Sequence, residues 1–404
     1  MKKPSKHVLS GVSLAVMLAS SQAVAADSIA EALESGKGYG DFRLRYENVD
    51  QDRTDVDEAT AVTLRSRIGY KTGSISGFSG LIEFEDSRIV AGQDEYTVGP
   101  TGFNPGEYSV IGDPESTELD QAFLQYKSDM ATVKLGRQVL TLDNHRFVGH
   151  VGWRQDRQTF DALSAVVTPA DGLTLTYAYL DQRNRIFEEV ADVNSKDHLF
   201  NVGYKTPFGK LTGYAYLLEV DQEADNALDT YGVRFAGSTD AGDLKVLYGA
   251  EFATQTKEAE GAEDVDTDYM MVEGGVVVAG ITLKANYEVL GSDDGNGGFA
   301  TPLATLHKFN GWADIFLGTP SVGLVDLTLS ASGKLGGGKW VVAYHDYEAD
   351  DAESGADDLG DEINLLYAKK FGKNYNAGIK YAAYSEGDVG VDTDKLWVWV
   401  GAKF

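Results

Sequence analysis

Four arginines of this chain occur in two pairs with a spacing of two residues: Arg43 with Arg45, and Arg65 with Arg67. Because side chains two positions apart in a β-strand point to the same face, each pair would project from one side of a strand. Guanidinium groups hold carboxylates through two parallel hydrogen bonds, and a ladder of them concentrates anions in a water-filled passage. We therefore interpret these arginines, together with Arg137, as residues that line a pore and favour anions.

Acidic residues in the same region offer a second interpretation of the arginines. Glu47 follows Arg45 at the same spacing, and Glu83 and Glu85 stand in the next predicted strand. Ion pairs between these carboxylates and the arginines would brace the wall of the pore. Both arrangements can hold together, since arginines and glutamates on opposed walls create an electric field across a pore. We therefore include Glu83 and Glu85 among the predicted selectivity residues.

The segments that carry these residues alternate between apolar and polar side chains. In residues 41–50 the apolar Phe42, Leu44 and Tyr46 alternate with charged residues, and the same pattern occurs in residues 61–71, 281–289 and 394–404. A period of two over about ten residues is typical of transmembrane β-strands, which have one face toward lipid and one toward a polar interior. Charges in a packed core would be costly, so a water-filled interior explains them better.

Short and long connections alternate along the chain: eight short turns and nine long loops, hence seventeen connections and eighteen strands. This count requires that residues 307–316 lie in a long loop and not in a strand. We predict an all-β fold, a transmembrane antiparallel up-and-down β-barrel with about eighteen strands, short periplasmic turns and long extracellular loops. A sixteen-stranded barrel is the alternative. A soluble sandwich or propeller is disfavoured because no blade-like repeat occurs and its surface would be too apolar.

The amino terminus has the features of a secretory signal peptide. Residues 1–25 combine a basic start, a short apolar stretch and a cleavage site of small residues at 23–25. We predict a lead-in over residues 26–40 and a single barrel over 41–404, located in the outer membrane of a Gram-negative bacterium. The formal net charge of -28 disfavours a nucleic-acid partner, because phosphate binding needs a basic surface. The absence of cysteine fits a barrel that its hydrogen-bond ladder holds together.

Residues 136–163 form the most distinctive stretch of the chain, GRQVLTLDNHRFVGHVGWRQDRQTFDAL. Together with HKFNGWAD at 307–314, DLTLSASGKLGGGKW at 326–340 and YHD at 344–346, it resembles the alginate export family of outer-membrane barrels over about residues 40–404. The resemblance implies an eighteen-stranded barrel whose loops fold partly inward as a constriction. It also implies pore-lining or loop-fixing roles for Arg137, Arg146, Arg154 and Arg157. The terminal Phe404 resembles the signal that the barrel-assembly machinery recognises in such proteins.

The long loops contain further residues that could form the constriction. We place His145, Trp153, Lys308 and Trp312 in this group, with the two tryptophans either stacking on sugar rings or packing the loops into the barrel mouth. The chain has no GxSxG motif and no serine at a suggestive spacing from His145. We therefore predict no enzymatic activity, no metal and no cofactor.

These observations predict an outer-membrane porin, through which small hydrophilic solutes, anionic or sugar-acid in character, diffuse passively along an arginine-lined lumen. Its partners would be these solutes, outer-membrane lipid and lipopolysaccharide, and the barrel-assembly machinery during biogenesis. Two alternatives stay open. One is a plugged barrel that binds ligands or adheres at the surface through its acidic loops, and the other is an export channel for an alginate-like polysaccharide.

Overall fold

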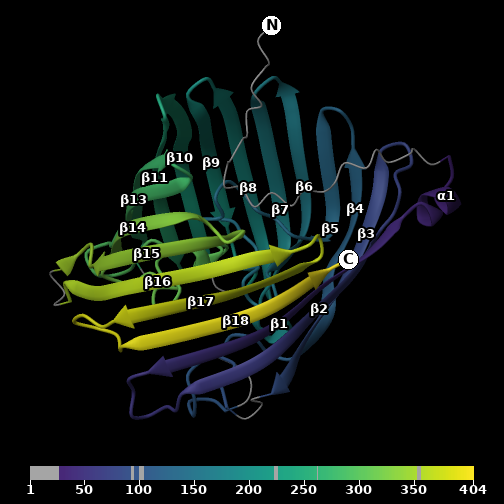
Figure 1. The fold of residues 1–404 in the computed structure, drawn as a ribbon. Coiled ribbons are helices and arrows are strands. Elements are labelled where there is room, and N and C mark those ends of the chain that lie inside the picture. The colour runs from purple at the N-terminus through teal and green to yellow at the C-terminus, as the bar shows by residue number, and fades with distance from the viewer. Residues whose placement is uncertain (1–26, 92–94, 100–103, 223–225, 262, 353–355) are drawn as a thin grey trace, which may run out of the picture.

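The computed structural model describes residues 27–404 apart from residues 92–94, 100–103, 223–225, 262 and 353–355 (Figure 1). A short helix, α1 (Ile29–Glu34), precedes the first strand and is capped by the side chain of Ser28. The strands in chain order are β1 (Lys37–Gln51), β2 (Ala59–Lys71), β3 (Phe78–Ala91), β4 (Ser116–Lys127), β5 (Ala131–Gln138), β6 (Thr159–Ala170), β7 (Leu173–Asn184), β8 (Val193–Thr206), β9 (Gly209–Leu218), β10 (Asn226–Ala241), β11 (Leu244–Ala259), β12 (Val265–Val278), β13 (Ile281–Leu290), β14 (Leu324–Leu335), β15 (Gly338–Glu348), β16 (Asp358–Phe371), β17 (Tyr375–Ser385) and β18 (Thr393–Lys403).

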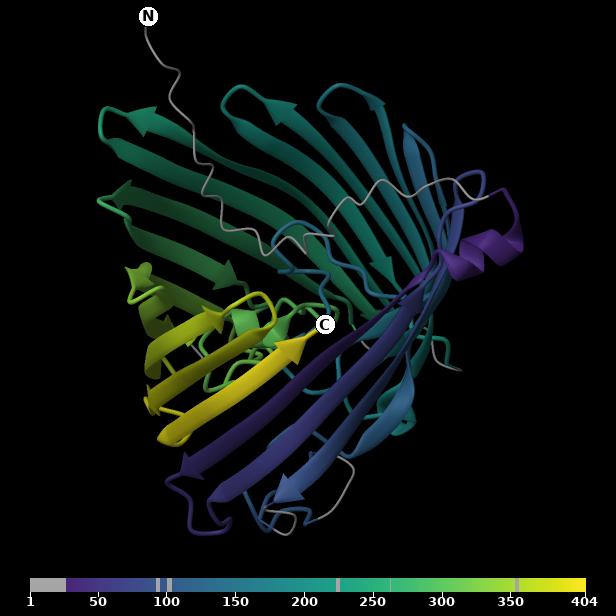
Figure 2. The ribbon, with the colours of Figure 1, turned by 45° about the vertical axis from the view of Figure 1, so that its right-hand side comes forward.

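These strands form one closed barrel. Each strand is antiparallel to the strand before and after it, and β18 pairs with β1, so that the sheet of 18 strands has no free edge. Arg45 stands opposite Trp399 across this closing seam. Figure 2 shows the tilted strands as a curved wall, with loop segments inside it. The predicted closed antiparallel barrel of eighteen strands is confirmed.

The connections alternate in length as the sequence predicts. Turns of two to six residues connect the strands at one end of the barrel, which we name the short-turn end. The connections at the other end, the long-loop end, have five to 33 residues and include two 3₁₀ turns, Glu189–Ala191 and Leu306–Lys308. The longest connection runs over residues 291–323 between β13 and β14. Residues 307–316 therefore lie in a loop, as the strand count requires.

Side chains alternate between the outside and the inside of the wall because successive residues of a strand point to opposite faces. On β18 the outward Val398 and Val400 are 42% and 52% exposed, whereas the inward Trp397 is fully buried. Outward apolar side chains recur on the other strands, such as Phe84, Leu135 and Leu329. This outer surface is apolar enough to face lipid, and polar side chains are directed into the barrel.

The predicted lead-in contains more structure than the sequence pattern indicates. Residues 27–40 include α1 and the first four residues of β1, which begins at Lys37. The predicted signal peptide, residues 1–25, lies outside the described residues. Within the part of the chain that the structure describes, no helix is long and apolar enough to cross a membrane.

Candidate functional site

Two of the long loops, residues 139–158 and 291–323, enter the barrel and pack against each other; together we name them the plug. The backbone N–H of Gly149 donates to the carbonyl of Leu303 at 2.8 Å, and the N–H of Thr305 donates to the carbonyl of His145 at 3.0 Å. The ring of Trp153 stacks on the ring of His307 with centroids 5.1 Å apart. The two loops, distant in sequence, thus form one body inside the wall.

The arginines of β1 and β2 face this plug from the wall, as the alternation predicts. Arg45 forms ion pairs with Asp113 and, at 3.1 Å, with Glu47, and its side chain is fully buried. Arg65 contacts Asp41 at 2.8 Å. Arg45 and Arg65 thus pair with carboxylates, as the second interpretation of the arginines expects.

The two predicted glutamates take part in the same wall network. Glu85 forms an ion pair with Arg67, and the Nε of Arg67 also lies 3.5 Å from Oδ2 of Asp120. Glu83 contacts Arg157 of the plug and accepts a hydrogen bond from Gln121 at 2.8 Å. Both glutamates are buried and point inward.

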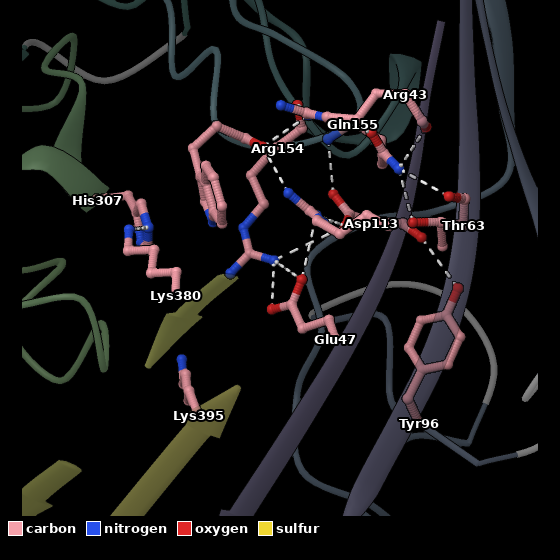
Figure 3. Close-up of polar contacts among 12 residues, drawn as sticks. Arg43, Glu47, Thr63, Tyr96, Asp113, Arg154, Gln155, His307, Lys380 and Lys395 are labelled. Atoms are coloured by element: carbon pink, nitrogen blue, oxygen red, sulfur yellow. Dashed lines mark hydrogen bonds and ion pairs between the residues drawn. The ribbon is translucent and has the colours of Figure 1, made fainter. Parts of the chain in front are cut away.

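Arg43 differs from the other arginines of this wall. It stands directly opposite Arg65 in the ladder between β1 and β2, which places two cations side by side. Its guanidinium donates to Gln155 Oε1 at 3.0 Å and to the carbonyls of Trp153 and Arg154 at 2.7 and 2.5 Å (Figure 3). Among the described residues no carboxylate lies within ion-pair distance of Arg43. Its positive charge is therefore satisfied only by neutral oxygens.

Three plug arginines connect the loops to the wall. Arg154 contacts Glu47 of β1 at 2.9 Å and Asp314 of the plug at 3.1 Å. Arg157 contacts Asp120 of β4 at 2.6 Å. Arg146 contacts Glu288 of β13 at 2.9 Å and is almost fully buried. Arginines suit such positions because their planar fork binds carboxylates in fixed geometry. These contacts fix the loops.

Arg137 is not in the lumen, contrary to the prediction. It shares its face of β5 with Leu135, which is 62% exposed, whereas Gln138 of the opposite parity is fully buried. Arg137 forms an ion pair with Asp161 at 2.8 Å on the outside of the wall. The pair borders a cavity of about 980 Å³ near the loop between β7 and β8. The correction follows from the two-residue period itself, since Leu135 and Arg137 have the same parity.

A buried lysine of the wall, Lys380, lies at the centre of the contact between plug and barrel. Its Nζ lies 4.3 Å from the ring centre of Trp153, 3.9 Å from that of Trp312 and 5.2 Å from that of Trp397. Rings of tryptophan attract cations through their negative faces. Trp312 also donates its backbone N–H to Glu362 of β16 at 2.5 Å. The two loop tryptophans therefore pack the plug against the wall.

His307 and Asp314 complete this contact from the plug. The Nδ1 of His307 lies 2.6 Å from an oxygen of Asp314, and Asp314 also lies 3.5 Å from Nζ of Lys395. Burial lowers the pKa of His307 to about 3, so its ring is neutral at neutral pH. Burial acts in the opposite sense on Asp314, but His307, Lys395 and Arg154 together hold the pKa of this carboxyl below its usual value. The sequence pattern did not single out Lys380, Lys395 or Asp314.

The opposite side of the plug packs on aromatic side chains of the wall. The ring of Phe147 lies 5.2 Å from the rings of Tyr214 and Tyr269 and 5.9 Å from that of Phe299 in the other plug loop. The plug therefore spans the lumen from a charged wall, β1 to β4 with β17 and β18, to an aromatic wall, β9 to β12. The contacts on the aromatic side are those of a packed core.

Two other predicted constriction residues, His145 and Lys308, lie at the surface of the plug. The rings of His145 and His150 meet edge to face with centroids 5.5 Å apart. Lys308 is exposed and donates from Nζ to the carbonyl of Asn144 at 2.6 Å. Partial burial and the nearby cations Arg234 and Lys284 lower the pKa of Lys308 to about 8. Among the described residues no carboxylate lies within ion-pair distance of Lys308.

The terminal Phe404 continues the outward face of β18. It is 65% exposed, and its ring lies 6.5 Å from that of Phe42 and 6.1 Å from that of Tyr375. Its role as an assembly signal stays a prediction.

Comparisons with known proteins agree with this architecture. The sequence model of the family described as alginate export matches residues 38–289. Among solved structures, Pseudomonas aeruginosa OpdK with vanillate has a TM-score of 0.72 at 13% identity, covering 92% of this chain and 99% of OpdK. Acinetobacter baumannii OccAB4 has a TM-score of 0.72 at 13% identity, covering 91% and 98%. Pseudomonas aeruginosa OccK9 (OpdG) has a TM-score of 0.73 at 14% identity, covering 92% and 99%. No curated protein matches the chain. At these identities the likeness to the solved structures shows the fold.

Proposed function

Because the chain belongs to the alginate export family, we propose that it is a porin of a bacterial outer membrane, through which small hydrophilic anions diffuse passively. The closed barrel can cross lipid because each of its strands is hydrogen-bonded to a neighbouring strand on both sides. Its interior supplies the path for the solute. The plug narrows this path to the space between its own surface and the wall. Passive diffusion needs a hydrated route and no catalytic group, so no enzymatic activity is part of the proposal.

The observation that carries anion preference is the set of cations with no carboxylate partner among the described residues. Arg43 on the wall and Lys308 on the plug both have this property. Arg43 also stands beside Arg65. Positive charges without counter-ions attract anions into a narrow, poorly screened space. The structure of OpdK that resembles this chain contains vanillate, a small aromatic carboxylate, and we extend that solute class to this protein.

The remaining features follow from this proposal. Export would use the predicted signal peptide, and insertion would use the barrel-assembly machinery with Phe404 as its signal. Outer-membrane lipid and lipopolysaccharide would surround the apolar outer face. An alginate-like polysaccharide is a less suitable solute, because acidic loops such as residues 50–58 would repel it at the long-loop end.

A plugged barrel that binds ligands at its surface is the second candidate, and the dense packing of the plug favours it. Val148, Leu303 and Phe299 of the two plug loops are almost fully buried. Conductance distinguishes the two candidates, since a plugged barrel carries no steady current.

The test is a planar bilayer measurement on the purified full-length protein. We expect discrete current steps and, in a KCl gradient, a reversal potential that shows anion preference. Arg43→Gln and Lys308→Gln should each reduce this preference. The matched control is Arg88→Gln, because the side chain of Arg88 is 51% exposed on the outer wall and should not influence the lumen. Cation preference would contradict the proposed solute class, and a complete lack of current would contradict the porin.

A further inference from the structure

Six lysines stand in three directly opposed pairs at the short-turn end of the barrel. The strand registers place Lys37 opposite Lys71, Lys205 opposite Lys210, and Lys334 opposite Lys339. Like charges directly opposite each other in a sheet repel and destabilise it. We name these six residues the lysine rim. Because such pairs lower the stability of the sheet, their occurrence in three separate parts of the wall points to a functional reason.

The lysine rim faces the lumen. On β15, Val342 and Tyr344 are exposed on the outer face, so Lys339 and His345 of the other parity point inward. On β8, the exposed Phe200 and Val202 alternate with the inward Leu199 in the same way, and Lys205 continues the inward row. The six charges are therefore directed at the solute path.

Few negative charges neutralise the rim. Lys210 contacts Asp143 of the plug at 2.7 Å. For the five other lysines, no carboxylate of the described chain lies within ion-pair distance. Other acidic residues at the same end are Asp129, Asp171 and Asp243 of the turns, Asp240 at the end of β10, and Glu31 and Glu34 of α1. Further lysines there are Lys134, Lys370 and Lys373, together with Lys245, which stands opposite Asp240, and Lys403, which pairs with Asp41 at 2.8 Å. Lysines outnumber the acidic residues. Positive charge dominates the short-turn end.

The long-loop end carries the opposite charge. Asp52, Asp55, Asp57 and Glu58 are exposed between β1 and β2, and Glu386, Asp388 and Asp392 follow β17. β1 is 15 residues long, and at about 3.4 Å per residue its ends are roughly 45–50 Å apart. That distance is several times the Debye length of about 10 Å in 0.1 M salt, so each end acts on ions separately.

We propose that these two charged ends make the pore an electrical rectifier, a property that rests on the proposed porin function. Anions collect at the lysine rim and cations collect at the acidic loops. A voltage that is positive on the long-loop side drives both kinds of ion into the middle of the pore and raises its conductance. A voltage of the opposite sign withdraws both from the middle and lowers the conductance.

The experiment requires barrels of known orientation. The chain has no cysteine, so Thr54→Cys supplies a single thiol in the exposed loop between β1 and β2 without removing a charge. Coupling of that thiol to biotin lets streptavidin, added to one side, mark the long-loop face. Current–voltage curves are then recorded in symmetric 0.1 M and 1 M KCl. We expect the current in 0.1 M KCl to be about two-fold larger or more when the long-loop side is positive, and the ratio to approach one in 1 M KCl, where the Debye length is about 3 Å.

Variants assign the effect to the rim. Lys334→Gln with Lys339→Gln should lower the current ratio, and a further Lys37→Gln with Lys71→Gln should lower it again. The matched control is Lys369→Gln, because Lys369 lies at the same end but shares the outward face of Ile363 and Leu365. The salt dependence of the unmodified barrel tests the proposal even where a variant fails to fold.

Each outcome has a separate meaning. Equal currents at both polarities in 0.1 M KCl would overturn rectification and leave the porin proposal intact. A larger current with the long-loop side negative would overturn the assignment of the two charged ends. The lack of any current would remove the porin function and rectification together.

Discussion

The Nζ of Lys380 on β17 lies 2.5 Å from the Nε2 of His307 in the plug. The two groups cannot both be cationic at this distance, so the lysine donates and the neutral imidazole accepts. Asp314 on the other ring nitrogen of His307 fixes the orientation of the ring. One side chain of the wall is thereby connected to the loop 291–323, and through the stacked Trp153 to the loop 139–158.

We predict that Lys380→Ala loosens the plug. The substitution removes the contacts of the cation with three tryptophan rings, which are worth about 0.5–2 kcal/mol each, and the packing of the lysine stem. The melting temperature should fall, and the single-channel current should become larger and noisier. Lys380→Met retains the stem and should have a smaller effect. An unchanged melting temperature in the alanine variant would contradict this account.

We predict that Arg154→Gln is strongly destabilising. Arg154 is buried between Glu47 and Asp314, and loss of one partner of a buried ion pair costs about 3–5 kcal/mol. Arg88→Gln, which breaks an exposed ion pair with Asp86, should cost less than about 1 kcal/mol. Urea unfolding of both variants in the same detergent measures the difference. Similar midpoints for the two would show that Arg154 does not fix the plug.

The anion preference of the pore should decline between pH 7 and pH 9. Lys308 has a pKa lowered to about 8 by partial burial and by Arg234 and Lys284, so it loses its charge in this range. Reversal potentials in a fixed KCl gradient at pH 6, 7, 8 and 9 measure the change. In Lys308→Met the same series should be nearly flat. A decline of equal size in that variant would assign the titration to another group.

The stability of the barrel should fall as the pH is lowered from about 7 toward 3. An unfolded histidine has a pKa of about 6.5, whereas burial lowers the pKa of His307 to about 3. Between these values the unfolded chain binds a proton that the folded chain does not, so acid favours unfolding. The midpoint of urea unfolding should drop less steeply with pH in His307→Gln. His150→Gln is the comparison variant. Burial and Arg157 lower the pKa of His150 to about 4, so the same reasoning about proton binding applies to this histidine.

The barrel itself could be predicted from the sequence because each strand carries its own two-residue pattern. The strand number, the alternation of turns and loops, and the loop position of residues 307–316 all follow from that local pattern. The inward direction of Arg45, Arg65, Glu83 and Glu85 follows from it as well. The same rule, applied from Leu135, would have placed Arg137 outside.

The contact between plug and wall could not be predicted in this way. Lys380, Asp314 and Trp153 come from three distant segments, and no periodicity relates a residue of a loop to the strand that it meets. A lysine on the inward face of β17, between the apolar Ile379 and Tyr381, was the available signal. Its partners depend on the path of two loops through the lumen, which tertiary packing decides.

The seam between β1 and β18 joins the two ends of the wall almost residue to residue. The N–H of Phe404 donates to the carbonyl of Gly40 at 3.0 Å, and the N–H of Gly40 donates to the carbonyl of Phe404 at 3.3 Å. The wall is therefore a closed ring in which every strand has a paired neighbour on both sides. A chain opened at an exposed long loop and rejoined near Gly40 should retain the same ring of strands. Because β18 closes the ring against β1, the barrel cannot close until both of these strands are in place.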